Sequence, residues 1–176
     1  QLDSAPTEGN RQDRQNFARF YARRLLAEVL LDAVDQACGT HSKFDRASSS
    51  ARAVDLPHEG FGSYFLDTFD RPRRVTGCEC ERTSGATLGQ VLLLSNSEEM
   101  ENKIGAKDGA IDRMLADKHS PEKIIEELYL GAFARLPTDA ERTRAAAFIA
   151  EQKDPRPALE DLLWALVNSK EFIFNH

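Results

Sequence analysis

The stretch SPEKIIEELYLGAF, at residues 120–133, determines the class of fold that this chain adopts. It begins with Ser120 and Pro121, a pair that typically caps a helix and fills its first turn. Its apolar residues recur at intervals of three and four, which places them on one face of an α-helix: Ile124, Ile125, Leu128, Tyr129 and Phe133. The stretch therefore predicts an amphipathic helix that packs against a core through that face.

The second half of the chain contains several more helix starts. Thr87 with Gln90, and Thr138 with Glu141, have the spacing of the capping box, in which two side chains bond reciprocally to the backbone at a helix N-terminus. Further helices are expected after residues 96–97, after residue 108 and from Pro157. We assign the apolar stripe of the last helix, with two aromatic residues, to the core before any carbohydrate-stacking surface: Leu159, Leu162, Leu163, Leu166, Val167, Trp164 and Phe172.

The first half contains one long predicted helix and an irregular region. Apolar residues at helical spacing run from residue 17 to residue 37, and Gly39 is expected to end this helix. Residues 39–62 are expected to be irregular, with an extended segment at 51–56. Residues 63–69 are short and aromatic-rich, and they are expected to form one or two helical turns.

Together these elements predict an all-α fold, an orthogonal bundle of about six to seven helices with a long irregular loop that contains a Cys-x-Cys sequence. No segment alternates apolar and polar residues strongly enough to require a sheet. We expect residues 1–15 to be a linker or disordered lead-in. Residues 16–176 are expected to form a single helical domain, the C-terminal fragment of a larger protein.

The composition indicates a compact globular protein rather than one that binds nucleic acid. The chain has 176 residues, of which 41% are hydrophobic and 30% charged, enough to bury one core. Its net charge of −6 opposes binding to a phosphate backbone. No apolar run approaches the length that crosses a bilayer. We therefore expect no nucleic-acid partner and no membrane span.

The most unusual segment is RPRRVTGCECER at residues 71–82. Pro72 and Gly77 argue against regular structure, so we expect a loop that is held by its side chains. The charged residues could bind an anion, because guanidinium groups bind carboxylates and phosphates bidentately. The interpretation we favour is a structural network that ties the loop to helix carbonyl groups or presents it to a partner. The residues concerned are Arg71, Arg74, Cys78, Glu79, Cys80, Glu81 and Arg82.

The cysteines permit two further hypotheses. A disulfide between Cys78 and Cys80 requires a bent backbone, because Cα atoms two residues apart in an extended chain are separated by about 7 Å. Alternatively, Cys38 and His41 could join them in a tetrahedral zinc site. The simpler interpretation makes Cys38 a small buried residue, and zinc is not expected. The Cys-x-Cys sequence also lacks the spacing and the histidine of a haem attachment site, so no cofactor is expected in this chain.

Several segments in a fixed order carry a family resemblance: residues 20–25, 63–67, 71–72, 78–82, 87–90, 94–97, 162–166 and 168–176. Together they resemble the C-terminal part of the planctomycete domain-of-unknown-function 1553 family over about residues 17–176. Two positions depart from the family pattern, since Asp70 replaces a glycine and Val75 replaces an acidic residue. These departures put in doubt a fixed backbone role at position 70 and a carboxylate role at position 75.

The resemblance implies a setting rather than a reaction, because the family has no established activity. Its members are typically large exported proteins with a companion domain of unknown function and often a c-type cytochrome domain. We therefore expect a periplasmic or cell-surface location, which favours a disulfide of some kind. Haem, if present, is expected elsewhere in the full-length protein. The expected partners are other domains of the same polypeptide or an exported protein.

Three functional hypotheses follow. The preferred one is a non-catalytic structural or interaction module, without catalytic residues, at the C-terminal end of a large exported protein. The second is a part of a periplasmic redox or carbohydrate-processing enzyme that uses the loop at residues 78–82. The third is a zinc-binding module.

Overall fold

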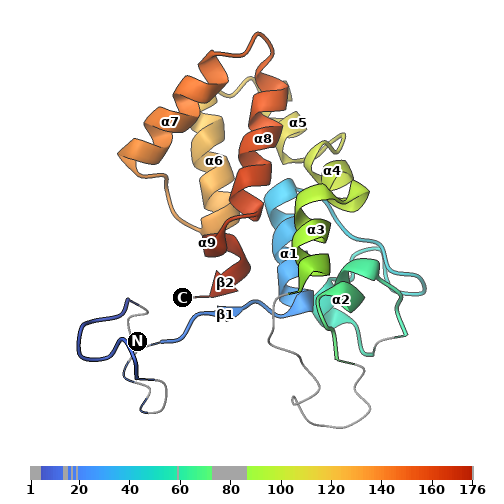
Figure 1. Ribbon diagram of the computed structural model, residues 1–176. Helices are drawn as coiled ribbons and strands as arrows, with labels where there is room; N and C mark the ends of the chain where they lie inside the picture. Colours follow the sequence, from blue (N-terminus) through green and yellow to red (C-terminus); the bar gives the residue numbers. More distant parts are fainter. Residues whose placement is uncertain are drawn as a thin grey trace.

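The described chain is mainly α-helical, with one small sheet (Figure 1). The computed structural model describes residues 5–13, 16, 18, 20–58, 60–72 and 87–175. Its helices are α1 (Ala27–Cys38), the 3-10 turn η1 (Ala53–Asp55), α2 (Tyr64–Thr68), α3 (Leu88–Asn96), α4 (Glu98–Ile104), α5 (Ala110–Ala116), α6 (Pro121–Phe133), α7 (Asp139–Ala150), α8 (Pro155–Val167) and α9 (Lys170–Ile173). Two short strands, β1 (Arg23–Arg24) and β2 (Phe174–Asn175), pair antiparallel. The helical fold class is thus confirmed, and the small sheet is the difference from the all-α prediction.

Helix α1 lies at the centre of the core. Its residues Leu30, Leu31 and Val34 are 0–1% exposed, and the helix contacts α2, α4, α5, α6, α8 and η1. In Figure 1 it lies between the group formed by α6, α7 and α8 and the helices α2 and α3. Burial of each such side chain contributes about 1.5–3 kcal/mol. One buried cluster extends from Ala27 to Phe172, while the predicted boundary near residue 15 stays a prediction.

The helix termini form largely through the local side-chain contacts that the sequence predicts. Both capping boxes are present, since the threonine at the start of α3 and of α7 exchanges hydrogen bonds with the third residue of each helix. At α6, the Ser120 hydroxyl accepts from the backbone of Lys123, and Pro121 is the first helical residue. Gly39 ends α1 with φ of 65°, a left-handed conformation that glycine adopts without strain.

The long helix predicted from residue 17 begins ten residues later, at Ala27. The segment before it pairs with the C-terminal strand instead, with Arg23 opposite Asn175 and Arg24 opposite Phe174. The backbone N–H of Leu25 continues this pairing by donating to the carbonyl of Ile173, at 2.9 Å. Apolar spacing alone gave no sign of a strand partner so distant in the chain, and Phe17 lies outside the described residues.

Two further boundaries differ from the prediction. The segment expected to be extended at residues 51–56 contains η1, because the carboxylate of Asp32 accepts from the N–H groups of Ala53 (2.7 Å) and Val54 (3.2 Å) and turns the backbone. The last long helix begins at Pro155 rather than Pro157, with Asp154 as its cap. No helix in the described ranges is long and apolar enough to cross a membrane.

Arg135 connects three helices at the point where α6 ends. Its guanidinium binds Glu141, in the first turn of α7, through two hydrogen bonds of 2.9 Å. It also binds Glu171 of α9 through bonds of 2.6 and 2.8 Å. Because Arg135 follows the end of α6, these bidentate contacts fix α7 and α9 relative to α6.

This connection is expected to be sensitive to acid. The Arg135 guanidinium, followed by the Thr138 backbone N–H, lowers the pKa of Glu141 from its ordinary 4.5 to about 2. A lowered pKa contributes stability that is complete above pH 4.5 and is lost as the pH falls toward 2. We expect Glu141→Gln to reduce stability at pH 7 by about 1 kcal/mol or less, because the pair is partly solvated.

Thermal unfolding at a series of pH values measures this effect. In the Glu141→Gln variant, the loss of stability between pH 4.5 and 2 should be shallower than in the wild type. The exposed Glu151 gives the control, since Glu151→Gln should keep the wild-type slope. Identical slopes for the wild type and Glu141→Gln would show that the contact does not contribute to stability.

Candidate functional site

The structure describes only part of the predicted site. Arg71, Cys38 and His41 lie within the described residues. The other members of the predicted loop network and zinc set fall outside them: Arg74, Cys78, Glu79, Cys80, Glu81 and Arg82. The Cys78–Cys80 disulfide and the role of this loop therefore stay predictions.

Arg71 is bound to the backbone and side chains around α2. Its guanidinium donates to the carbonyl of Phe61 at 2.8 Å and to the carboxylate of Asp67 at 2.9 Å. The Arg71 side chain is only 5% exposed. At this position the guanidinium ties irregular backbone to the end of a helix, and little of it is accessible to a ligand in solution.

A buried glutamine joins the end of α2 to the start of α3. The amide nitrogen of Gln90 donates to the carbonyl of Thr68 at 3.0 Å and to the carboxylate of Asp70 at 3.1 Å. The amide oxygen accepts from the backbone of Thr87 and from the guanidinium of Arg24. Residues on either side of the segment 73–86 are thus held together through one side chain that is 3% exposed.

Asp70 has a backbone conformation that favours glycine. Its φ of 60° lies in the left-handed region, where glycine is favoured and aspartate is tolerated. The Asp70 carboxylate lies 3.7 Å from the Arg24 guanidinium and also binds Gln90. Asp70 therefore adopts a left-handed conformation at this position and makes two side-chain contacts.

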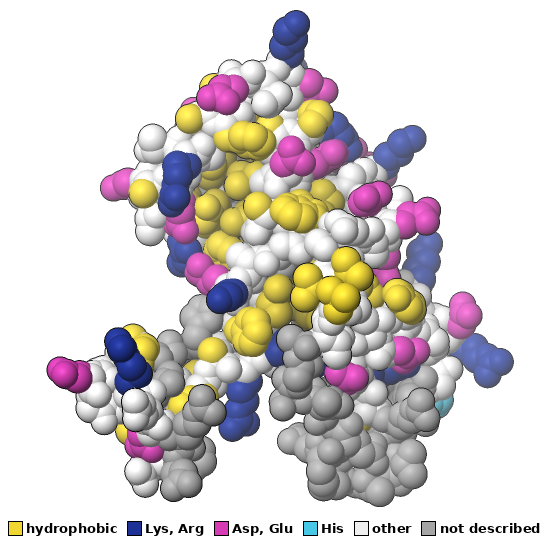
Figure 2. Space-filling model, in the orientation of Figure 1, with side chains coloured by type: hydrophobic (Ala, Val, Ile, Leu, Met, Phe, Trp, Pro, Cys, Tyr) yellow, Lys and Arg dark blue, Asp and Glu magenta, His cyan; other side chains and the backbone are white. Residues whose placement is uncertain are grey.

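Exposed apolar side chains gather on a second region: Leu88, Val91 and Leu92. Together with Ser95, we call this region the α3 face. These positions lie on one side of α3, at the spacing i, i+3, i+4 and i+7. Leu88 is 74% exposed, Val91 57% and Leu92 49%. Helix α3 contains no charged residue, and apolar side chains are visible over it in Figure 2.

Trp164 adjoins the α3 face, which corrects its assignment to the core. It is 41% exposed, whereas the neighbouring Leu163 is fully buried. One helical residue corresponds to a rotation of about 100°, so Trp164 lies at the margin of the inward stripe of α8. Its indole N–H donates to the carbonyl of Ser95 at 3.0 Å. Phe172, which was assigned to the same stripe, is buried as expected.

On the other side of Trp164 lies a groove between α6, α7 and α8. The groove has a volume of about 440 Å³, and Tyr129, Phe148 and Leu162 contribute to its apolar lining. Arg144 and Asp161 are among its polar residues. Figure 2 shows hydrophobic side chains between α7 and α8 as well as over α3. We call the α3 face, Trp164 and this groove together the apolar surface.

Cys38 and His41 occupy different environments. Cys38 is 1% exposed on α1, and His41 is exposed on the loop that follows. Burial raises the pKa of the Cys38 thiol to about 12, with Lys103 opposing the rise and Asp35 adding to it. A zinc ligand has to be a thiolate, which this environment disfavours. Within the described part of the chain, no three His, Cys, Asp or Glu residues are grouped for a metal. The four-ligand set stays a prediction.

Lys103 forms a buried polar cluster beside Cys38. Its ammonium group donates to the carboxylate of Asp35 and to the hydroxyl of Ser42, the latter at 2.7 Å. The same carboxylate accepts from the Thr40 hydroxyl at 2.9 Å and the Ser42 N–H at 2.8 Å. Burial would raise the pKa of Asp35, but these hydrogen bonds, led by Lys103, lower it below its ordinary value.

Gln90, Lys103 and Asp35 are buried polar residues that were not predicted from the sequence. A signal was nevertheless present for Lys103, which falls at core spacing between Met100 and Ile104 on α4. A charged residue at an inward position requires a buried partner.

The buried Cys38 thiol should react slowly. A rise in its pKa from 9.0 to about 12 lowers the thiolate fraction at pH 8 by about a thousandfold. We expect iodoacetamide at pH 8 to alkylate Cys38 at least that much more slowly in the folded protein than in urea. Mass spectrometry of the Cys38 peptide separates this reaction from those of the other cysteines. Equal rates in the two states would contradict the environment described for Cys38.

The Gln90 contacts should be important for stability. We expect Gln90→Ala to lower the free energy of unfolding by about 1–3 kcal/mol, because the buried Gln90 side chain leaves and partly buried groups of Thr68, Asp70 and Arg24 lose a partner. Urea unfolding measures the change. Gln36→Ala, at an exposed position in α1, should change stability by less than about 0.5 kcal/mol. Similar effects of the two substitutions would show that the Gln90 contacts are not stabilising.

Comparisons with known proteins identify a family but no described relative. Neither the proteins with curated descriptions nor the solved structures gave a match. The family model PSD1, "Protein of unknown function (DUF1553)", matches residues 1–149. The match begins before residue 17, where the resemblance was placed, and ends before the segments at 162–166 and 168–176. Because it covers most of the chain, this protein belongs to the DUF1553 family.

Proposed function

We propose that this chain is a non-catalytic interaction module that docks through its apolar surface onto another domain of the same polypeptide. The observation that carries the proposal is the α3 face, where Leu88, Val91 and Leu92 are 49–74% exposed on a helix without charge. Isolated exposed apolar residues are common, but a continuous surface of them is typical of an interaction site.

The energetics of covering this face favour association. Full burial of a leucine or valine side chain contributes about 1.5–3 kcal/mol. Helix α3 has no charged side chain that would lose its water on binding. The desolvation cost of covering this face is therefore small. Trp164 adds an aromatic ring whose orientation is already fixed by its bond to Ser95, which lowers the entropy cost of binding.

Electrostatics and the family resemblance favour a different domain over a second copy as the occupant. Two copies would each carry a net charge of −6, and their repulsion opposes self-association. The family resemblance implies a long exported polypeptide with further domains. A periplasmic or cell-surface location is part of this proposal.

The polar cluster at Lys103 supports a non-catalytic interpretation of the described residues. Ser42 beside a lysine is the arrangement that could form an activated nucleophile. Here the Lys103 ammonium group donates to Ser42 and to the Asp35 carboxylate. An ammonium group held in this way is a hydrogen-bond donor to the hydroxyl and is not placed to remove its proton.

Photo-crosslinking in the full-length polypeptide that contains these residues tests the proposal. Val91 is replaced by benzoylphenylalanine, which reacts with whatever covers the α3 face, and the product is mapped by mass spectrometry. Val54, in η1, is 37% exposed and belongs neither to the α3 face nor to the lining of the groove, so it gives the control position. We expect an intramolecular crosslink from position 91 to a residue outside 1–176, and none from position 54.

A second substitution tests the contact itself. Leu92→Glu places a charge in the covered face, so the crosslink yield from position 91 should fall about tenfold, equivalent to about 1.4 kcal/mol. The melting temperature of the variant verifies that it folds. A crosslink between two copies, a crosslink confined to residues 1–176, or no crosslink would each contradict the proposal.

A further inference from the structure

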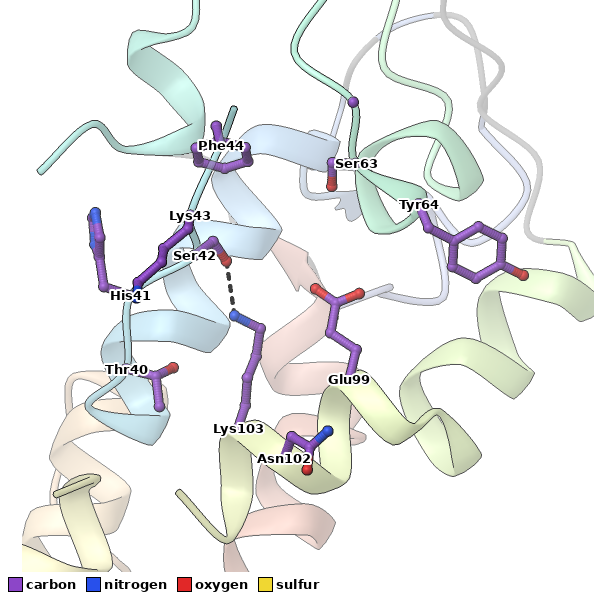
Figure 3. A pocket seen from close by; sticks show the side chains of 11 residues that line it. Thr40, His41, Ser42, Lys43, Phe44, Ser63, Tyr64, Glu99, Asn102 and Lys103 are labelled. Carbon is purple, nitrogen blue, oxygen red and sulfur yellow. Dashed lines mark hydrogen bonds between the residues drawn. The ribbon is translucent and has the colours of Figure 1, made fainter. Parts of the chain in front are cut away.

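A polar cavity separate from the apolar surface lies beside Lys103 (Figure 3). It has a volume of about 440 Å³. Three segments enclose it: the loop 40–44 after α1, residues 62–64 at the start of α2, and the face of α4 that carries Glu99, Asn102 and Lys103. A cavity of this size can hold a small molecule or one long side chain.

At the base of the cavity, one positive and one negative charge cancel each other. The Lys103 ammonium group is paired with the Asp35 carboxylate, and Thr40 and Ser42 complete the hydrogen bonds of that carboxylate. The positive charge of Lys103 is therefore already compensated inside the protein. Lys43, which also lines the cavity, extends toward His41 and away from Glu99 in Figure 3.

Glu99 is the acidic residue in the lining of the cavity. Its carboxylate points into the cavity, toward the region between Ser63 and Lys103 (Figure 3). Within the described ranges, the Glu99 carboxylate accepts no hydrogen bond and forms no ion pair. Lys103 lies one turn further along α4, the usual position for a helical ion-pair partner, but its ammonium group is turned to Asp35.

We propose that this cavity binds an ammonium or guanidinium group through the Glu99 carboxylate. A half-buried carboxylate without a donor is unfavourable, and a cationic donor would supply both charge and hydrogen bonds. The Phe44 side chain, which lines the cavity, supplies apolar surface for the carbon chain of such a ligand. The net charge of −6 also attracts cations to the protein.

The state of Glu99 in the unliganded protein supports this assignment. Burial raises the pKa of Glu99, partly opposed by Lys103 and reinforced by Asp35. A raised pKa means that the folded state gains stability as the pH falls through this pKa toward the ordinary 4.5, and loses it as the pH rises. At neutral pH the ionised Glu99 is thus a cost to folding, as is common for residues kept for binding. The other titratable groups around it are Lys103, Asp35, Lys43, His41 and Tyr64.

The test uses ethylguanidinium and its uncharged isostere ethylurea as probes, with NMR detection of backbone amides. Ethylguanidinium at millimolar concentration should shift the amides of Ser42, Ser63 and Asn102 saturably, and ethylurea should not. A short peptide with one arginine, compared with the same peptide carrying citrulline, distinguishes a free small cation from a basic side chain as the source of the group.

Two variants assign the effect to Glu99. Glu99→Gln should weaken binding of ethylguanidinium at least about tenfold and raise the melting temperature at pH 7. Glu98→Gln, at the neighbouring exposed position outside the cavity, should leave both unchanged. Absence of saturable shifts with both ethylguanidinium and the arginine peptide, equal shifts with the uncharged probes, or full binding by Glu99→Gln would each overturn the proposal. These outcomes are independent of the docking proposed for the α3 face.

Discussion

The burial of α1 is the constraint on which the other elements depend. Its apolar residues Leu30, Leu31 and Val34 contribute to the core that α2, α6 and α8 close around the helix. The C-terminal turn of α1 carries Asp35 and Cys38, so its position also determines where the buried cluster with Lys103 forms. The placement of the cavity beside Glu99 follows from the same packing, because α4 is tied to α1 through that ion pair.

The helix starts could be predicted from sequence because the interactions that form them are local. Thr87 bonds with Gln90, and Thr138 with Glu141, across three residues of chain. Such contacts are already possible in a short peptide and need no knowledge of the tertiary fold. The beginning of α1 could not be found in this way. The strand that precedes it pairs with residues about 150 positions later, and its sequence carries no turn or alternation that signals the pairing.

Less of the candidate site could be predicted, for a related reason. Lys103 and Asp35 are 68 residues apart in sequence. Gln90 binds Thr68 and Arg24, which are 22 and 66 residues away from it. Periodicity identifies which face of a helix is buried, but it does not identify which buried polar groups meet. Trp164 illustrates the same limit at the margin of a helix face, where a rotation of one residue separates core from surface. Arg71, which was singled out from sequence, binds Asp67 of α2 and the carbonyl of Phe61 before that helix.

The antiparallel pairing of β1 with β2 has a mechanical consequence. Arg23 lies opposite Asn175 and Arg24 opposite Phe174. The start of β1 and the end of β2 therefore lie at the same end of the strand pair. A force that pulls the start of β1 away from the end of β2 would unzip the pair. Its hydrogen bonds would break one after another rather than all at once. The strand pair would therefore open at low force, before the load reached the helical core.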